Sequence, residues 1–244
     1  MIRLGMLLFQ ELFGCAINPG RESLKRLVKG NKMHRSVMGI YGLTCTGKST
    51  LGTTLTDSSV GTYTSFGGLI RNEVAKATSL GKNIENALLL KQPIPLELGW
   101  QLLNDQLVGE LNFVSGYPFT EQELGYMSRE GVLLAGWILL TAQDAVIRRR
   151  YAESRAECPL CNRPGEIGSF CDVHAVPFES RVDPQGLKLD FEKRKRTMDT
   201  LVTPFLLSSH MQQLPKLVID TTSIDREKAA TKASHWLEQT FPSP

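Results

Sequence analysis

The sequence predicts an α/β fold in which a parallel sheet is covered by helices on both faces. A short apolar run at 36–41 is followed by a glycine-rich loop and then by small and apolar residues at 47–56, which is the order strand, loop, helix. A second apolar run, at 132–140, has about half the length that a bilayer-spanning helix needs, so it indicates a buried strand or core helix.

The composition is that of a soluble globular protein with one large domain. The chain has 244 residues, 41% hydrophobic and 22% charged, which is enough to bury a substantial core. Its 28 basic and 25 acidic residues give a net charge of +3, too even a balance to favour a nucleic-acid partner. No internal transmembrane segment is expected, so no membrane partner is predicted either. We expect a cytoplasmic monomer.

Residues 1–35 form an N-terminal extension before the first predicted strand. Its start, MIRLGMLLFQELFGCA, has one early arginine and a Leu-Phe-Gly-Cys sequence similar to a lipoprotein cleavage site. Glu11 interrupts the apolar run, which is short for an export signal. We therefore interpret the segment as an amphipathic helical extension, with translation starts at Met33 or Met38 as a further alternative.

The loop at 42–49, GLTCTGKS, fits the phosphate-binding P-loop pattern of Gly, four residues, then Gly-Lys-Ser. Its glycines permit backbone angles that turn successive N–H groups toward a polyphosphate, and the following helix adds positive charge at its N-terminus. Lys48 is predicted to reach the β and γ phosphates and Ser49 to hold Mg²⁺. The alternative is a tight strand-to-helix turn without a ligand. The predicted ATP-binding residues of this segment are Gly42, Thr44, Cys45, Thr46, Gly47, Lys48, Ser49 and Thr50.

The sequence after the loop resembles the adenylate kinase family from about residue 36 to the end. Residues 65–107 are similar to the family's monophosphate-binding insert, with its Gly-x-Leu-x-Arg opening and its Ile-Pro-x-Glu-Leu turn. Residues 112–124, NFVSGYPFTEQEL, resemble the strand and Asp-Gly-Phe-Pro-Arg-Thr motif. Residues 144–155 resemble the arginine-bearing helix that leads into the lid, and 179–184 with 194–206 resemble the lid exit and the next helix.

This resemblance implies a three-layer P-loop NTPase fold over 36–244, with a helical acceptor insert near 65–97 and a lid near 156–184. The activity it implies is Mg²⁺-assisted transfer of the ATP γ-phosphate to a nucleoside monophosphate. In such a reaction the protein places donor and acceptor in line and surrounds the transferred group with cations.

The resemblance also implies roles for individual arginines. Arg71 matches the insert arginine that clamps the acceptor phosphate; the alternative is an exposed helix residue paired with Glu73 or a neighbour. Arg150 and Arg155 match the lid arginines, but the family spaces them four apart and here they are five apart, so Arg148 and Arg149 are alternatives to Arg150. The implied catalytic residues are Lys48, Arg150, Arg181 and Arg194, with Arg150 also an ATP ligand; the implied monophosphate ligands are Phe66, Gly67, Arg71, Gly116, Glu123, Arg181 and Arg194.

The acceptor motif departs from the family pattern at several positions. Ser115 stands where the family has the Asp that helps to hold Mg²⁺, and Phe119 stands where it has a phosphate-binding Arg. Glu123 stands at the adenine-selecting Gln, although Gln122 is adjacent. A carboxylate only accepts hydrogen bonds, so Glu123 would favour a base edge that presents donors. The alternative is that Glu123 and Phe66 are ordinary helix-surface and core residues.

Four metal-binding side chains cluster in the predicted lid. Cys158-x2-Cys161 and Cys171-x2-His174 are separated by nine residues, a spacing that predicts a structural Zn²⁺ site. Asp172 is an alternative to His174 as fourth ligand, and reduced cysteines that line a loop are the alternative to a metal. Zinc lids also occur in the family that the chain resembles.

Two other functions compete with the kinase. A nucleotide-binding protein with weak or no transfer activity is favoured by Ser115 and Phe119. A nucleic-acid contact is suggested by the basic stretch 148–155 beside the cysteines, but Tyr151 is the only aromatic residue within that stretch.

Overall fold

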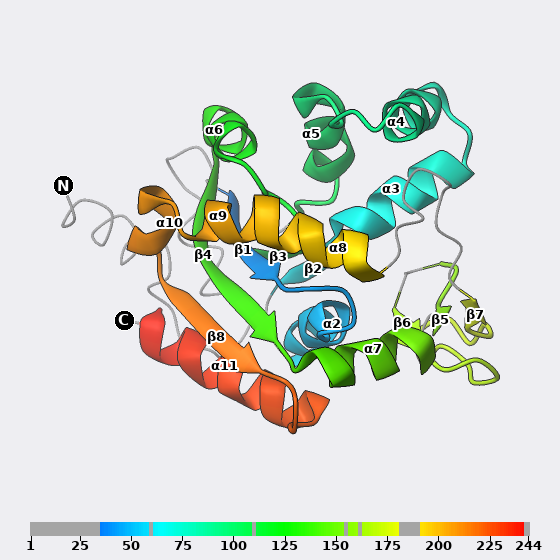
Figure 1. Ribbon diagram of the computed structural model, residues 1–244, viewed down its shortest axis with the longest axis vertical. Helices are drawn as coiled ribbons and strands as arrows, with labels where there is room; N and C mark the ends of the chain where they lie inside the picture. Colours follow the sequence, from blue (N-terminus) through cyan, green and yellow to red (C-terminus); the bar gives the residue numbers. More distant parts are fainter. Residues whose placement is uncertain are drawn as a thin grey trace, which may run out of the picture.

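The protein is built on one five-stranded parallel sheet (Figure 1). A computed structural model describes residues 35–58, 61–108, 111–153, 156–160, 163–180 and 191–241. The strand order is β2-β3-β1-β4-β8, so the first strand lies at the centre. All four neighbouring pairs are parallel. The strands are β1 (Arg35–Tyr41), β2 (Thr62–Ser65), β3 (Leu111–Ser115), β4 (Val132–Thr141) and β8 (Lys216–Asp220).

Each face of the sheet has its own hydrophobic core, because side chains of a strand alternate between faces. Met38 and Ile40 of β1 pack in the core that includes α2 (Lys48–Ser58) and α11 (Arg226–Thr240). Val37 and Tyr41 pack in the opposite core, which includes α5 (Leu96–Asn104) and α6 (Glu121–Arg129). Figure 1 shows α2 and α11 on one side of the sheet and α6 on the other. The predicted three-layer α/β fold is thus confirmed.

Three helices lie between β2 and β3, where an acceptor insert is predicted. They are α3 (Phe66–Ala75), α4 (Ser79–Leu89) and α5. Ser65 caps α3 by accepting from the Gly68 N–H, and Thr78 caps α4 by accepting from the Gly81 N–H. Ile84, Trp100 and Leu103 bury these helices against the main core. Helices α3 and α4 lie within the predicted limits of 65–97, whereas α5 extends beyond them to Asn104. The division of the chain into domains stays a prediction.

A second, three-stranded antiparallel sheet forms within the predicted lid. It consists of β5 (Ala156–Glu157), β6 (Pro164–Gly165) and β7 (Glu179–Ser180), in the order β6-β5-β7. Its small core contains Cys158, Cys171 and Phe178 among others. Helix α7 (Asp144–Glu153) leads into this sheet from β4 (Figure 1). Residues 1–34 of the predicted extension, Cys161, Arg155 and the 181–190 segment with Arg181 lie outside the described residues.

After the lid, an irregular helical segment crosses the carboxyl edge of the main sheet. Helix α8 (Phe191–Thr197) continues into a π-helical turn, η3 (Met198–Val202), and then into α9 (Thr203–Leu206) and α10 (Ser209–Gln213). Such π turns occur often at functional sites. Within the part of the chain that the structure describes, no helix is long and apolar enough to cross a membrane.

The acceptor-insert helices offer a test of the packing. Leu103 is fully buried, whereas Leu90, at the end of α4, is 67% exposed. We expect Leu103→Ala to lower the free energy of unfolding by about 2–5 kcal/mol, because it leaves a cavity in the core. Leu90→Ala is expected to change it by less than about 0.5 kcal/mol. Urea unfolding followed by circular dichroism measures both, and equal effects would contradict the assignment of Leu103 to the core.

Candidate functional site

A cavity of about 780 Å³ lies at the carboxyl edge of the main sheet. Ser65 ends β2, Ser115 ends β3, and both line it together with the loop that follows β1. In open parallel sheets ligands bind in the crevice beyond the carboxyl ends of the strands. The cavity also touches α3, α8 and the start of α11, so it connects the main sheet with both the helical insert and the lid.

The glycine-rich loop adopts the backbone that its sequence predicts. Gly42 and Gly47 have φ values of 138° and 98°, in the region that side chains disfavour. A Cβ atom on Gly42 would lie 2.4 Å from the carbonyl oxygen of Leu140, so the loop passes too close to β4 for any side chain. Thr46 closes the turn by donating its hydroxyl to Leu43 O at 2.8 Å. Cys45 also has a positive φ of 61°.

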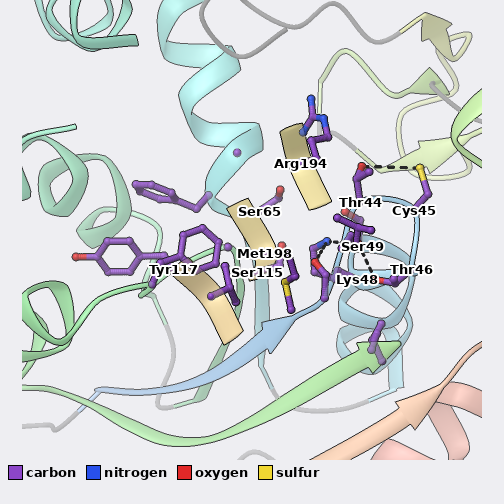
Figure 2. A pocket seen from close by; sticks show the side chains of 18 of the residues that line it. Thr44, Cys45, Thr46, Lys48, Ser49, Ser65, Ser115, Tyr117, Arg194 and Met198 are labelled. Carbon is purple, nitrogen blue, oxygen red and sulfur yellow. Dashed lines mark hydrogen bonds between the residues drawn. The ribbon is translucent and has the colours of Figure 1, made fainter. Parts of the chain in front are cut away.

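Lys48 and Ser49 begin α2 and face the cavity (Figure 2). The Lys48 Nζ donates to the carbonyl oxygens of Gly42 at 2.7 Å and Leu43 at 2.9 Å. The ammonium thus lies beside the loop, where a phosphate would compete with these carbonyls for it. All eight predicted ATP-binding positions of this segment line the cavity: Gly42, Thr44, Cys45, Thr46, Gly47, Lys48, Ser49 and Thr50.

Ser115 is hydrogen-bonded to Tyr63, which the sequence analysis did not single out. The Tyr63 hydroxyl and Ser115 Oγ are 2.8 Å apart, at the position where the resembled family has a carboxylate. Burial raises the pKa of the Tyr63 phenol, and hydrogen bonds from Ser115, Ser49 and Ser65 oppose that rise. Neutral hydroxyl groups therefore lie beside Ser49 in place of an acidic side chain.

Thr221 joins three parts of the site and was also missed. Its hydroxyl lies 3.1 Å from Thr46 O in the loop and 3.0 Å from Thr141 O at the end of β4. Arg150 donates from Nη1 to the Thr221 hydroxyl at 3.2 Å and from Nη2 to Thr221 O at 2.7 Å. The buried Thr221, directly after β8, is thus hydrogen-bonded both to the glycine-rich loop and to Arg150, the predicted lid arginine.

Of the arginines predicted for the lid, the structure brings Arg150 and Arg194 to the cavity wall. Figure 2 shows Arg194 across the cavity from Ser49. Arg148, proposed as a substitute for Arg150, instead contacts Glu192 and lies 4.3 Å from the centre of the Phe191 ring. Arg226, at the start of α11, also lines the cavity and was not predicted from the sequence.

The other end of the cavity is aromatic. The rings of Phe66 and Tyr117 have centroids 4.8 Å apart, and Phe119 lies 6.2 Å from the Tyr41 ring. Tyr117 lies at the end away from Thr44 and Ser49, with Ser65, Ser115 and Met198 between them (Figure 2). The predicted acceptor residues Phe66, Gly67, Arg71, Gly116 and Glu123 all line the cavity.

Glu123 serves as the cap of α6. Its Oε2 accepts from the backbone N–H groups of Phe119 at 2.6 Å and Thr120 at 3.1 Å, and Thr120 Oγ1 accepts from the Glu123 N–H in return. Burial raises the pKa of this carboxyl, and the same backbone hydrogen bonds oppose the rise. This contact favours the ordinary helix-terminal interpretation; selection of a base by Glu123 stays a prediction.

Arg71 forms a two-point ion pair with Glu157 of the lid sheet. The Nε donates to Oε1 at 3.1 Å and Nη2 donates to Oε2 at 2.9 Å, across 86 residues of sequence. Both side chains line the cavity, yet Arg71 is only 7% exposed and Glu157 18%. The alternative of an exposed arginine paired with Glu73 is wrong, since Arg71 is buried and Glu73 contacts Lys76 and Thr78.

Cys158, Cys171 and His174 gather in the lid as a group that can hold a metal ion. The His174 Nδ1 is 3.7 Å from Cys158 Sγ and 3.8 Å from Cys171 Sγ. Zinc bonds of about 2.3 Å to sulfur and 2.0–2.1 Å to nitrogen place such atoms about 3.6 Å apart on a tetrahedron. Burial raises the pKa of the Cys171 thiol, but hydrogen bonds from the Val173 and His174 N–H groups and from the His174 and Cys158 side chains outweigh it and lower the pKa to about 6. These three residues fit zinc; Asp172 instead pairs with Arg163.

The parallel sheet, the glycine loop after its central strand and the cavity beyond its carboxyl edge define a P-loop NTPase fold. Sequence comparison finds adenylate kinases among the proteins that are similar to the chain. The chain is 29% identical over 162 residues to an adenylate kinase of Thermococcus onnurineus (60% of this chain, 71% of the relative). It is 26% identical over 179 residues to an adenylate kinase of Pyrococcus furiosus (67% and 80%) and 27% identical over 180 residues to one of Pyrococcus horikoshii (67% and 80%). No protein-family model matches the chain. These relatives are 26–29% identical to the chain, a similarity that supports a distant relationship to adenylate kinases.

The position of Thr221 can be tested by removing its hydroxyl. We expect Thr221→Val to lower the free energy of unfolding by about 1–3 kcal/mol, because Thr46 O loses its buried partner. Thr231→Val removes a hydroxyl that donates to Glu227 O on the exposed face of α11, and it is expected to cost less than about 0.5 kcal/mol. Thermal unfolding compares the two variants. Equal losses would show that Thr221 does not fix the loop.

Proposed function

We propose that the chain is an ATP-dependent nucleoside monophosphate kinase, which transfers the γ-phosphate of ATP to the phosphate of a nucleoside monophosphate. The observation that carries this proposal is that one cavity joins the P-loop to Arg71 in the helical insert and to Arg150 and Arg194 on the lid side. A transferred phosphoryl group spreads its charge over its oxygens, so cations on several sides favour its transition state. The similarity to adenylate kinases of Thermococcus and Pyrococcus supports the same reaction.

At the donor end, the loop N–H groups and Lys48 hold the β and γ phosphates of ATP. Lys48 exchanges the carbonyls of Gly42 and Leu43 for phosphate oxygens, which are the better partners because they are charged. Bound Mg²⁺ supplies charge neutralisation between the β and γ phosphates, and Ser49 is the residue that would hold it. Arg150 and Arg194 contribute positive charge from the lid side, together with Arg181, which lies outside the described residues.

At the acceptor end, Arg71 binds the monophosphate, whose oxygen attacks the γ-phosphorus of ATP. The bond from the γ-phosphorus to the oxygen shared with the β-phosphate breaks, and ADP and a nucleoside diphosphate leave. No covalent intermediate with the protein is involved. The acceptor base lies against the aromatic end of the cavity, where Phe66 and Tyr117 offer ring surface. We propose Phe66, Gly67, Gly116 and Glu123 as the surrounding acceptor residues.

A second candidate is a nucleotide-binding protein with weak or no transfer activity. It is favoured by the side chains at 115 and 119. Ser115 bonds to a phenol instead of offering a carboxylate, and Phe119 packs near Tyr41 instead of presenting a cation to the acceptor. Losing one preorganised donor at a transferring charge costs about 2.7–4 kcal/mol of transition-state stabilisation, so a slow enzyme is consistent with these residues.

For the lid, we propose a structural zinc ion held by Cys158, Cys171, His174 and Cys161, the last of which is outside the described residues. The ion replaces a hydrophobic core that the small sheet is too short to build. The reduced-cysteine alternative predicts no bound metal.

We further propose that the protein acts in the cytoplasm as a monomer on small nucleotides, without nucleic-acid or membrane partners. Support comes from the basic stretch near the lid, two of whose arginines are engaged within the protein. Arg148 contacts Glu192 and the Phe191 ring, and Arg150 is held by Thr221.

A coupled assay that offers Mg-ATP with AMP, GMP, CMP or UMP tests the activity. We expect turnover with at least one acceptor, and we expect Lys48→Ala to lower kcat/KM roughly 100- to 1,000-fold because a cation at the transferred group is lost. Lys82→Ala, which removes an exposed lysine of α4, is the matched control and should retain activity. Nucleotide binding without turnover for all four acceptors would refute the kinase and leave the second candidate.

Metal analysis of the purified chain tests the zinc proposal. We expect one zinc per chain by plasma mass spectrometry, and Cys158→Ser to lower both the zinc content and the Tm, by roughly 5 °C or more, because metal binding contributes to the stability of the lid. Cys45→Ser changes a cysteine outside this group and should retain the zinc. A metal-free wild-type protein with an unchanged Tm in the presence of a chelator would favour plain reduced cysteines.

A further inference from the structure

The ion pair between Arg71 and Glu157 places a carboxylate on the residue proposed to hold the acceptor phosphate. The contact uses both Glu157 oxygens and two nitrogens of Arg71, at 3.1 and 2.9 Å. A guanidinium binds a carboxylate and a phosphate with the same planar, two-point geometry. Glu157 therefore occupies one of the two-point edges with which Arg71 could bind a phosphate.

The position of Glu157 connects this contact to the lid. Glu157 belongs to β5, directly before the metal-binding Cys158, whereas Arg71 belongs to α3 of the helical insert. Both side chains line the same cavity as Lys48 and Ser49. The pair is not a surface contact, since the Arg71 side chain is 7% exposed and the Glu157 side chain 18%.

We propose that Glu157 is an acceptor-site residue that competes with the nucleoside monophosphate for Arg71 and so sets the affinity for the acceptor. This inference rests on the proposed function, in particular on Arg71 as the phosphate clamp. A phosphate dianion displaces the carboxylate because it carries more charge, and the displaced Glu157 frees β5 from α3.

The competition has a measurable size. The apparent affinity for a ligand falls in proportion to the fraction of molecules in the competent state, here those in which Arg71 is not held by Glu157. If Arg71 is paired in about nine molecules of ten, removing the carboxylate charge strengthens acceptor binding about tenfold. ATP binding at the P-loop does not involve this pair and should change little.

The experiment is isothermal titration calorimetry of the full chain with AMP, GMP, CMP and UMP and, separately, with an unreactive ATP analogue. The variants are Glu157→Gln, Glu157→Ala, Arg71→Ala and the matched control Glu179→Gln. Glu179 lies opposite Glu157 in the antiparallel β5–β7 pair and is exposed, so its replacement removes the same charge from the same small sheet.

We expect both Glu157 variants to bind the preferred monophosphate about five- to tenfold more tightly than the parent chain, while their Tm falls because a buried arginine loses its charged partner. Glu179→Gln should leave the acceptor affinity unchanged. The affinity for the ATP analogue should be the same in the parent chain and in the three variants with a replaced glutamate. Tighter binding in a less stable protein is a result that a purely structural salt bridge does not produce.

Two results would overturn the inference, and they differ in whether they also contradict the proposed function. If Arg71→Ala weakens acceptor binding but the Glu157 variants bind no more tightly than the parent chain, Glu157 does not compete and the proposed kinase is unaffected. If Arg71→Ala leaves acceptor binding unchanged, or no monophosphate binds to any variant, the phosphate clamp fails and the competition fails with it.

Discussion

The close approach of the glycine loop to the end of β4 is the constraint on which the rest of the site depends. The loop can leave β1 along this path because Gly42 has no side chain to strike Leu140 O. Thr46 then closes the turn, and Thr221 holds Thr46 O from the far side. With the turn fixed, α2 starts with Lys48 and Ser49 directed at the cavity. The backbone at the centre of the sheet thus determines where Lys48 and Ser49 point.

The proposed acceptor side is organised differently from the proposed donor side. The donor side is made of backbone groups and a helix start, which depend little on the identity of neighbouring side chains. The acceptor side is made of side chains, and here these are aromatic rings, a capping carboxylate and an arginine held by the lid. Divergence from the resembled adenylate kinases is therefore easiest on the proposed acceptor side. The positions at 115, 119 and 123 differ from the family motif while the P-loop keeps its pattern, which agrees with this expectation.

The features that sequence reasoning found are those that local sequence determines. The P-loop lies within one short segment, the first strand and helix flank it, and the cysteine and histidine spacing of the lid can be recognised without the fold. Tyr63, Thr221 and Glu157 could not be found in this way. Their contacts join residues that are 52, 175 and 86 positions apart, so only the packed sheet and lid bring them together. Glu123 shows the converse problem, because a helix cap and a base-selecting residue occupy the same position in the motif and the sequence does not separate them.

Within the described part of the chain, three carboxylates line the cavity, and each is engaged by the protein itself. Glu123 accepts from backbone N–H groups, Glu157 from Arg71, and Asp225 from the Lys228 N–H at the start of α11. The negative charge of each carboxylate is therefore partly balanced by the N–H donors that it accepts from. The basic residues Lys48, Arg150, Arg194 and Arg226 also line the cavity. The cavity can contain acidic side chains and still attract polyanions, because the electrostatic potential at the ligand depends on the local balance of charge and not on the number of acidic residues.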